Sequence, residues 1–428
     1  MARLRHIEHF PRQYEILGEN VVWTETKRRE PISSMPVLFW NDSSPWREAN
    51  LWALERADSG DVSIDTVRSN MTSLLMYANW LEASGTDWWH FPLKKSERCL
   101  VMYRGFVVRQ RDNDVIAPST ASQRMRDVIS FYRWLRAANF LISDWPLWKE
   151  HNISIRFTTD VGFQRTMMIQ TTDLAIKNRR RSGVHLEDGV TPVSSVDRDA
   201  ILEFVKQHGS WEVFLLLTLG FFTGMRIGTL CDLKIDSLRR ATREPLAPSL
   251  YRIAIGPAAR PTVKTKYDVS GHCWITAEHR DLILRYADSS RRISRANKAK
   301  NYDSELIFLS KNGNPYVRTN TQRSSSVNVE MHELRKKAKV HGITAFEGFY
   351  FHQTRATFAT QLATALLPLV GVAGTVGLVR EAMLHRDEST TLKYIKFVQQ
   401  SPIKEAIANE FTKAFMGVAS SLIGNEHE

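Results

Sequence analysis

Apolar residues that recur every three or four positions are the feature of this sequence that most constrains its fold. Between Ser63 and Gly85 such a stripe predicts a helix, because residues at this spacing share one helical face. A second helix is expected over 97–110. A third is expected to start at a Ser/Thr cap near residue 119 and to turn one apolar face inward, made of Met125, Val128, Ile129, Tyr132 and Leu135. We therefore predict a helical module in the first half of the chain.

The second half of the chain adds a small β-sheet to further helices. The segment SSVDRDAILEFVKQHG predicts a capped helix that ends at Gly209, and WEVFLLLTLGFF predicts a core helix after it. Two expected strands, YRIAI and GHCWIT, flank the segment PAARPTVKTKYDVS. The expected fold class is mainly α, with a small β-sheet in the second half.

The charge of the chain suggests a polyanionic partner. Its 58 lysines and arginines against 46 acidic residues give a formal net charge of +12 over 428 residues. Basic side chains that face phosphates gain from counterion release, so nucleic acid is the expected partner class. The scattered cysteines Cys99, Cys231 and Cys273 indicate neither a disulfide framework nor a zinc site.

No targeting segment is expected. The start MARLRHIEHF is charged and lacks the apolar run of a signal peptide. The most hydrophobic window, 365–379, is shorter than the ~18 residues that a membrane span needs, and Pro368 and three glycines interrupt it. We expect a buried connection there, no membrane partner, and a cytoplasmic protein at the nucleoid.

Two short motifs in the second half carry the candidate chemistry. HQTR places His352 and Arg355 on one helical face, and HRDESTTLKY places Tyr394 nine residues after His385. Arginine offers a fork of donors to phosphate oxygens, histidine moves protons near neutral pH, and tyrosine can attack phosphorus. Upstream, FFTGMRIGTLCDL predicts a turn into a fresh helix with Arg226 in its first turn. Together these side chains indicate phosphoryl transfer.

Three ordered segments resemble the motif boxes of a known enzyme family. TGMRIGTLCDLKIDSL, HQTRATFAT and LHRDESTTLKYIKF are similar to the first arginine box, the second box and the nucleophile box of tyrosine recombinases of the phage integrase kind. The resemblance implies a site-specific enzyme that cuts and rejoins DNA through a 3′-phosphotyrosyl intermediate, for integration or excision of a mobile element. It implies no metal, ATP or other cofactor, and the sequence has no Gly-Lys-Ser/Thr phosphate loop.

The resemblance also implies a role for each side chain. Tyr394 would be the nucleophile, and His352 the base that takes its proton. Arg226 and Arg355 would hold the charge of the phosphate, to which His385 would also donate.

A lysine on a β-hairpin serves as general acid in the family, which directs attention to the loop between the two expected strands. Lys264, in the Lys-Thr pair, is the first choice for this role. Lys266 stays open as the alternative.

The family pattern implies four regions along the chain. These are an N-terminal extension of unknown role, a helical core-binding domain that clamps DNA, a linker with the basic run NRRRSGVH, and a catalytic domain with a C-terminal helix: 1–60, 61–148, 149–195 and 196–428. The helix near residue 119 resembles the last helix of the core-binding domain. Arg124, Arg126 and Arg133 are therefore candidate DNA contacts, with Lys266, although a solvated basic face fits the same pattern.

The expected partners follow from the same likeness. They are double-stranded DNA attachment sites, further copies of the chain in a homotetramer on DNA, and accessory DNA-bending or mobile-element proteins. An apolar stripe predicts the C-terminal helix, at Ile403, Ala406, Ile407, Phe411, Phe415 and Val418. This helix packs either on its own domain or, as in family members, on a neighbouring protomer.

The sequence departs from the family pattern in three places. Leu384 stands where a glycine usually precedes the second histidine, and Thr229 where an acidic residue is usual. The segment between Arg355 and His385 is longer than typical and rich in Gly and Ala. Two other functions are the alternatives. A type IB topoisomerase shares this chemistry. A non-catalytic DNA-binding protein on the same scaffold would be marked by loss of the tyrosine or an arginine, and this sequence keeps them.

Overall fold

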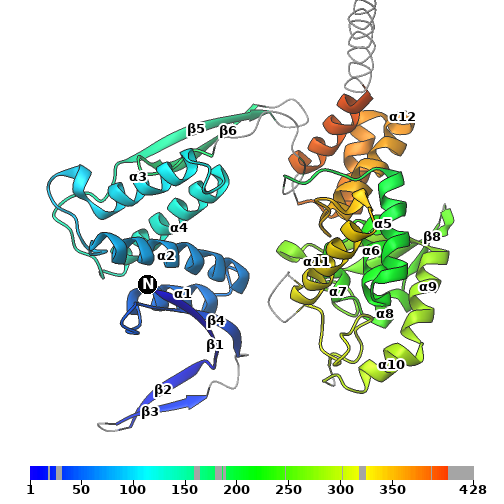
Figure 1. The fold of residues 1–428 in the computed structure, drawn as a ribbon, viewed down its shortest axis with the longest axis horizontal. Coiled ribbons are helices and arrows are strands. Elements are labelled where there is room, and N and C mark those ends of the chain that lie inside the picture. Colours follow the sequence, from blue (N-terminus) through cyan, green and yellow to red (C-terminus); the bar gives the residue numbers. More distant parts are fainter. Residues whose placement is uncertain are drawn as a thin grey trace, which may run out of the picture. The chain divides into compact units, whose positions relative to one another are not determined.

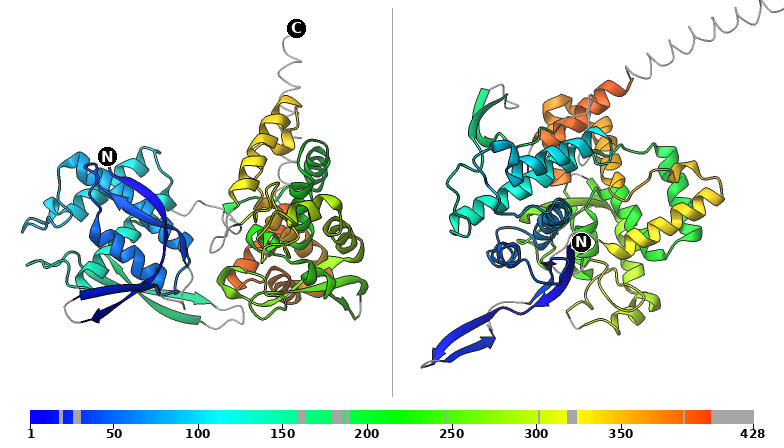
Figure 2. Two further views of the ribbon diagram at one scale, coloured as in Figure 1. Left: turned by 90° about the horizontal axis from the view of Figure 1, so that it is seen from below. Right: turned by 60° about the vertical axis from the view of Figure 1, so that its left-hand side comes forward.

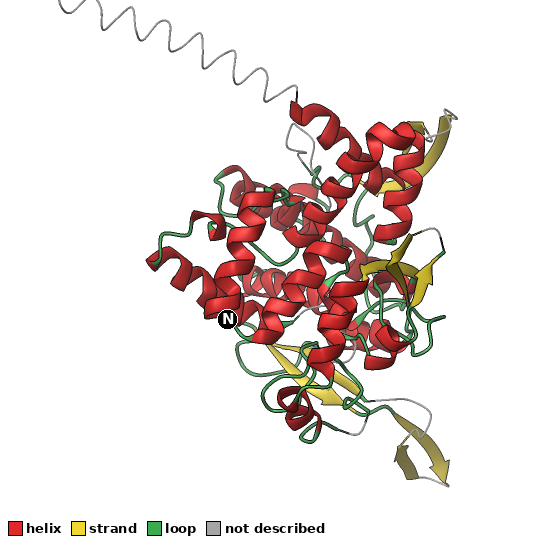
Figure 3. Ribbon diagram, turned by 90° about the vertical axis from the view of Figure 1, so that its right-hand side faces the viewer, coloured by secondary structure: helices red, strands yellow, loops and turns green. Residues whose placement is uncertain are grey.

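The computed structural model divides into two compact units. One spans Met1–Ser182, and the other begins at Gly183. Each has its own buried core, and helices predominate in both (Figure 1, Figure 3), so the mainly α fold class is confirmed. The residues that the structure describes are 1–17, 20–25, 31–158, 164–178, 186, 189–245, 247–300, 302–317, 324–386 and 388–402.

The first unit combines a helical core with antiparallel pairs of strands. Its helices are α1 Arg47–Asp58, α2 Ile64–Ser84, α3 Cys99–Asp112 and α4 Pro118–Ala137, with a 3-10 turn at Lys95–Glu97. The paired strands are β1 Arg3–His9 with β4 Ile32–Phe39, β2 Arg12–Leu17 with β3 Asn20–Glu25, and β5 Glu150–Thr158 with β6 Gln164–Thr172. The β2–β3 ribbon projects away from the helices of this unit (Figure 2).

The helices predicted for this unit are present. Helix α2 begins where the Ser63 hydroxyl accepts a hydrogen bond from the Thr66 N–H at 3.3 Å, and it ends at Gly85 with φ 61°. Helix α4 begins at Pro118, whose fixed φ suits a first helical position, and not at the Ser/Thr cap that we expected. All of the predicted inner face of α4 is buried.

Aromatic side chains fill the core of the first unit. Trp46 and Trp52 both pack on Phe131, with ring centroids 5.4 and 5.5 Å apart, and the hydroxyls of Tyr77 and Tyr132 hydrogen-bond at 2.7 Å. The two tryptophans come from the stretch that we described as an N-terminal extension. Leu174 and Ile176 of the expected linker are buried in the same cluster. The structure thus places the extension, the helices and part of the linker around one core.

The second unit surrounds a three-stranded sheet with helices. Its sheet contains β7 Thr242–Glu244, β8 Ala247–Ile255 and β9 Gly271–Thr276 in that order, with the two expected strands paired antiparallel. Its helices are α5 Ser195–His208, α6 Trp211–Thr223, α7 Ile227–Cys231, α8 Ile235–Arg239, α9 Ala277–Ala287, α10 Ser290–Ala296, α11 Ser325–Val340 and α12 Gln353–Met383, with 3-10 turns at Lys266–Asp268 and Thr344–Phe346. Residues 388–402 are also helical.

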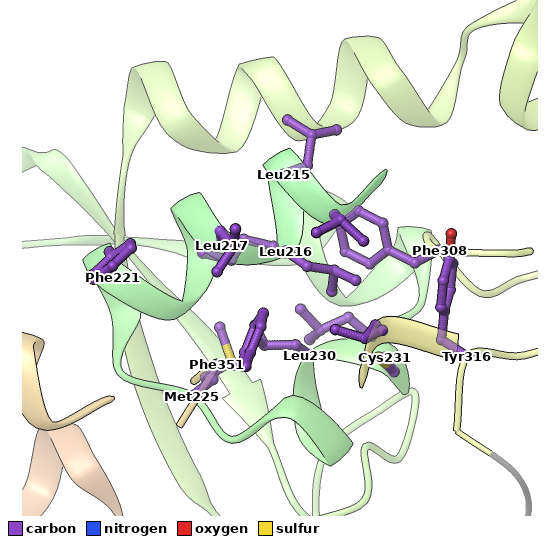
Figure 4. Close-up of a cluster of buried hydrophobic side chains, with 14 of the residues drawn as sticks. Leu215, Leu216, Leu217, Phe221, Met225, Leu230, Cys231, Phe308, Tyr316 and Phe351 are labelled. Atoms are coloured by element: carbon purple, nitrogen blue, oxygen red, sulfur yellow. The ribbon is translucent and has the colours of Figure 1, made fainter. Parts of the chain in front are cut away.

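Helix α6 runs through the core of the second unit. Figure 4 shows Leu216 and Leu217 of this helix beside Leu230 and Phe351, all within one buried cluster. Most of its side chains are buried, as its sequence predicted, although Phe222 is exposed. Its burial fixes the turn that follows it, which leads directly into the candidate site.

Helix α12 corrects our expectation of a buried connection over 365–379. The segment is helical, with Pro368 inside it and a non-helical Gly371 at φ 67° and ψ −172°, so two helical pieces meet there. Leu369 at this bend is 78% exposed. By length and composition α12 is the described helix that could cross a membrane, which is weak evidence because one such helix is common in soluble proteins.

A buried carboxylate joins α6 to α9 and α10. Glu212 is fully buried and accepts hydrogen bonds from Tyr286 Oη at 2.9 Å and from Arg291 Nε at 2.7 Å, while Arg295 Nη2 lies 3.1 Å away. Burial acts to raise the pKa of Glu212, but the bonds from Arg291 and Tyr286 and the charge of Arg295 hold the pKa below its ordinary value. The ionised form therefore stabilises the fold.

We expect Glu212→Gln to lower the free energy of unfolding by about 3 kcal/mol at neutral pH, because the buried Arg295 and the more exposed Arg291 lose their counter-charge. Since the folded pKa lies below the unfolded one, the contribution is present above the ordinary Glu pKa and is lost as pH falls through the folded pKa. Urea unfolding between pH 3 and 7 measures this, with the exposed Glu203→Gln as the matched control. A difference that did not shrink in acid would contradict the assignment.

Candidate active site

The turn after α6 places Arg226 at the wall of a small pocket. Gly224 ends α6 in the left-handed conformation, with φ 68°, and Arg226 is the residue that caps the start of α7. A Cβ at Gly224 would lie 2.4 Å from Phe358 Cδ1, so a side chain is excluded there both by conformation and by space. The Thr-Gly turn that the sequence predicted is thus a requirement of the packing.

Arg355 lies in the first turn of α12 and is almost completely buried. Its Nη1 donates a hydrogen bond to the Gly224 carbonyl at 2.6 Å, and its Nη2 donates to the Met383 carbonyl at 2.7 Å. These two carbonyls precede Arg226 and His385 by two residues each. One guanidinium therefore fixes the backbone beside both of these side chains.

The pocket brings three basic side chains together. Arg226, Arg355 and Lys266 line it, and its other described lining residues are uncharged: Met225, Thr229, Ile255, Thr265, Val269, Cys273, Met383 and Leu384. Its volume is about 20 Å³, which is room for roughly one water molecule. Arg355 is buried and Arg226 and Lys266 are half-buried, and donors of this kind at one pocket suit the oxygens of an anion.

The two candidate lysines differ in where they lie. Lys266 is half-buried at the pocket, with its Nζ 5.2 Å from the ring centre of Tyr267. Lys264 is exposed and is not among the lining residues, and its backbone N–H donates to Asp232 Oδ2 at 2.7 Å. Lys266 thus lies at the pocket wall and Lys264 does not, and the choice of the catalytic lysine stays a prediction.

His385 and Tyr394 form a second group next to the pocket. Their rings stack with centroids 5.8 Å apart and an angle of 11° between the planes. Nδ1 of His385 lies 2.9 Å from the Thr391 hydroxyl. Tyr394 is fully buried in a cluster with Ala356, Ala359 and Val379 of α12, and with Leu186.

Leu384 keeps the turn that leads into this second group. Its backbone has φ 49° and ψ 48°, which is the left-handed conformation that glycine adopts most easily. A non-glycine residue costs roughly 1 kcal/mol there. The Leu384 side chain lines the pocket, at the position where the family usually has a glycine.

His352 caps the start of α12 and is half-buried, but it does not line the pocket. Its carbonyl accepts a hydrogen bond from the Arg355 N–H at 3.2 Å. The structure therefore places the proposed base one helical turn from the proposed phosphate ligand, without bringing it to the pocket wall.

Cys273 is the thiol in the pocket lining, and its environment excludes it as a nucleophile. Burial raises its pKa to about 12, an effect that the nearby Arg355 partly opposes. At neutral pH the thiol therefore stays protonated and poorly reactive.

The candidate DNA contacts of the first unit lie along α4. Arg124 Nη1 and Arg126 Nη1 donate to the side-chain oxygens of Gln110 and Gln123, both at 3.3 Å. Arg133 is exposed, with Nη2 3.7 Å from Glu150. These contacts within the protein are weak, so the three arginines remain candidates for DNA contact. Nothing in the described part of the chain tests that role.

Sequence reasoning missed the residues that orient the candidates. Thr391 lies in the quoted HRDESTTLKY motif, six residues after His385, but a threonine there gave no signal of its own. The carbonyls of Gly224 and Met383 could not be found from sequence, since every residue has one.

Residues 195–400 match the model of the phage integrase family. No curated protein matches the chain significantly. Among solved structures, the chain is similar to the Tn1549 transposon integrase in complex with a circular intermediate DNA, with 15% identity, 81% of this chain and 94% of that chain covered, and a TM-score of 0.48. A lambda integrase dimer bound to a COC′ core site gives 11% identity, 82% and 94% coverage, and a TM-score of 0.45. XerA recombinase is 14% identical, with 85% of this chain and 98% of that chain covered and a TM-score of 0.34.

The close approach at Gly224 generates a stability prediction. Gly224→Ala should lower the free energy of unfolding by about 2–4 kcal/mol. The new Cβ would clash with Phe358, and alanine is strained in the left-handed conformation that glycine adopts freely. Gly342→Ala is the matched control, since Gly342 has a similar φ of 69° but open space around it. Equal losses for the two variants in urea unfolding would show that backbone strain alone matters at Gly224.

Proposed function

Because residues 195–400 belong to the phage integrase family of tyrosine recombinases, we propose that this chain is a site-specific DNA strand-exchange enzyme. It cuts and rejoins DNA through a 3′-phosphotyrosyl intermediate, and serves the integration or excision of a mobile element. The observation that carries the proposal is the pocket lined by Arg226, Arg355 and Lys266, with no acidic side chain among its described lining residues. This is a site for the phosphate of a diester.

In this proposal Tyr394 attacks phosphorus. A tyrosine hydroxyl has a pKa of ~10 and needs a base as the new bond forms. His352 takes the proton, the Tyr394 oxygen bonds to phosphorus, and the bond from phosphorus to the 5′-oxygen breaks. A lysine of the 256–270 loop gives its proton to that oxygen. Rejoining reverses these steps, so the energy of the diester is kept.

The arginines stabilise the charge that grows on the phosphate oxygens during attack. Arg355 is suited to this role, because its position is fixed before DNA arrives by the Gly224 and Met383 carbonyls. Arg226, at the start of α7, lines the same pocket. His385 donates to the same phosphate, next to Tyr394.

The pocket and the proposed nucleophile are both closed to DNA in this structure. A volume of about 20 Å³ is too small for a phosphodiester, and Tyr394 is fully buried. We infer that binding of attachment-site DNA, with further copies of the chain in a homotetramer and with accessory DNA-bending or mobile-element proteins, opens the pocket and brings Tyr394 to the phosphate. The C-terminal stripe from Ile403 and the basic run NRRRSGVH lie outside the described residues, and their roles in assembly and DNA contact stay proposals.

A covalent-trapping experiment tests the nucleophile. The wild-type protein, with a nicked duplex taken from the DNA that flanks its own gene, should give a protein–DNA adduct, and Tyr394→Phe should bind this duplex and give none. Tyr350→Phe is the matched control, because Tyr350 is an exposed tyrosine near the same helix, and it should keep the adduct. An adduct formed by Tyr394→Phe would refute the assignment.

A second experiment separates the two lysines. Lys266→Ala should slow cleavage by at least ~10²-fold, because the leaving oxygen loses its proton donor, and Lys264→Ala should slow it less than ~10-fold. A substrate with sulfur in the 5′-bridging position should restore the Lys266→Ala rate, since the thiolate leaves without a proton. Rescue of Lys264→Ala in place of Lys266→Ala would assign the role to Lys264.

A further inference from the structure

A groove in the first unit lies at the C-terminal end of α2. Its volume is about 360 Å³, and it is lined by Trp40, Leu81, Glu82, Gly85, Thr86, Asp87, Trp88 and Trp89. All of these residues belong to the first unit, and none is among the candidates for DNA cleavage or DNA contact. The proposed recombinase chemistry therefore leaves this groove without a role.

The walls of the groove are aromatic. Trp88 and Trp89 meet at 87°, with ring centroids 5.1 Å apart, so their faces form a corner. Trp40 packs against the buried Trp46, with ring centroids 4.6 Å apart and 32° between the planes, and the ring centroid of Trp46 lies 6.4 Å from that of Trp88. Indole faces carry negative electrostatic potential and attract a cation within about 6 Å.

The polar part of the lining is negative. Glu82 and Asp87 are its ionisable side chains. Helix α2 ends at Gly85 and has no basic residue in its last turn, so the negative end of its dipole is not compensated from within the helix. Glu82 Oε1 accepts the Asn41 N–H at 2.7 Å, and its Oε2 lies 3.4 Å from the Met1 ammonium, whereas the described residues form no hydrogen bond or ion pair with the Asp87 carboxylate.

We propose that this groove binds an arginine or lysine side chain presented by a protein partner. The aromatic corner receives the cationic head, and Glu82 and Asp87 supply the counter-charge. The same charges repel a DNA phosphate, which separates the groove from the basic surface that the chain needs for DNA. Trp89 is 55% exposed. A free cation would leave its ring in contact with water, whereas the protein surface around a partner's arginine or lysine would cover the ring.

The test uses the full chain labelled with 5-fluorotryptophan and observed by fluorine NMR. The probe is a capped Gly-Gly-Arg-Gly-Gly peptide, and its control is the same peptide with citrulline, a neutral analogue of nearly the same shape. The resonances of Trp88 and Trp89, assigned from Trp88→Phe and Trp89→Phe, should shift saturably with the arginine peptide. The citrulline peptide should bind about tenfold more weakly. Trp145, which is 41% exposed and lies outside the groove, is the control resonance and should not shift.

A charge variant completes the test. Glu82→Gln with Asp87→Asn keeps the shape of the groove and the acceptor for Asn41, and it should remove the preference for arginine over citrulline. No saturable shift, or equal binding of the two peptides by the wild type, would overturn the proposal. A concentration-dependent dimer in sedimentation that Trp89→Ala abolishes would also overturn it, by assigning the groove to a second copy of the chain. None of these readouts depends on DNA cleavage. Failure of the groove proposal can therefore be distinguished from failure of the recombinase proposal.

Discussion

The bridge made by Arg355 is the interaction on which the second unit depends. Its guanidinium donates to the Gly224 carbonyl and to the Met383 carbonyl, and so it ties the end of α6 to the end of α12. Both helices are followed by left-handed residues, Gly224 and Leu384, that turn the chain toward Arg226 and His385. A lysine could not make this bridge, because it lacks the planar fork. The residue proposed to bind phosphate also builds the frame around its own pocket.

The same burial that orders the site also closes it. Arg355, His385 and Tyr394 are all less than 9% exposed, and the pocket between the basic side chains holds about one water. Tyr394 is buried beside His385, and its hydroxyl cannot reach a phosphate in this arrangement. For a DNA-cleaving enzyme this has a physical advantage. In the proposed function, strand cutting would then require a change that bound DNA drives.

Two cavities, one in each unit, have linings of opposite charge. The candidate cleavage pocket concentrates positive charge, while the groove at the end of α2 combines tryptophan faces with Glu82 and Asp87. The groove is opposite in sign to the chain as a whole, whose net charge is +12. Under the two proposals, nucleic acid and a protein partner would therefore bind at different cavities.

The sequence by itself determined the helical class, most helices and both long strands of the second sheet, because apolar periodicity and cap residues act locally. It also determined which side chains could serve phosphoryl transfer, since that depends on residue type. It did not reveal that Trp46 and Trp52 belong to the core of the first unit, that 365–379 forms an exposed helical bend, or that Lys266 lines the pocket while Lys264 does not. Those features arise from contacts between segments far apart in the chain. Only the tertiary structure decides them, because the burial and direction of a side chain depend on which neighbours the fold brings to it.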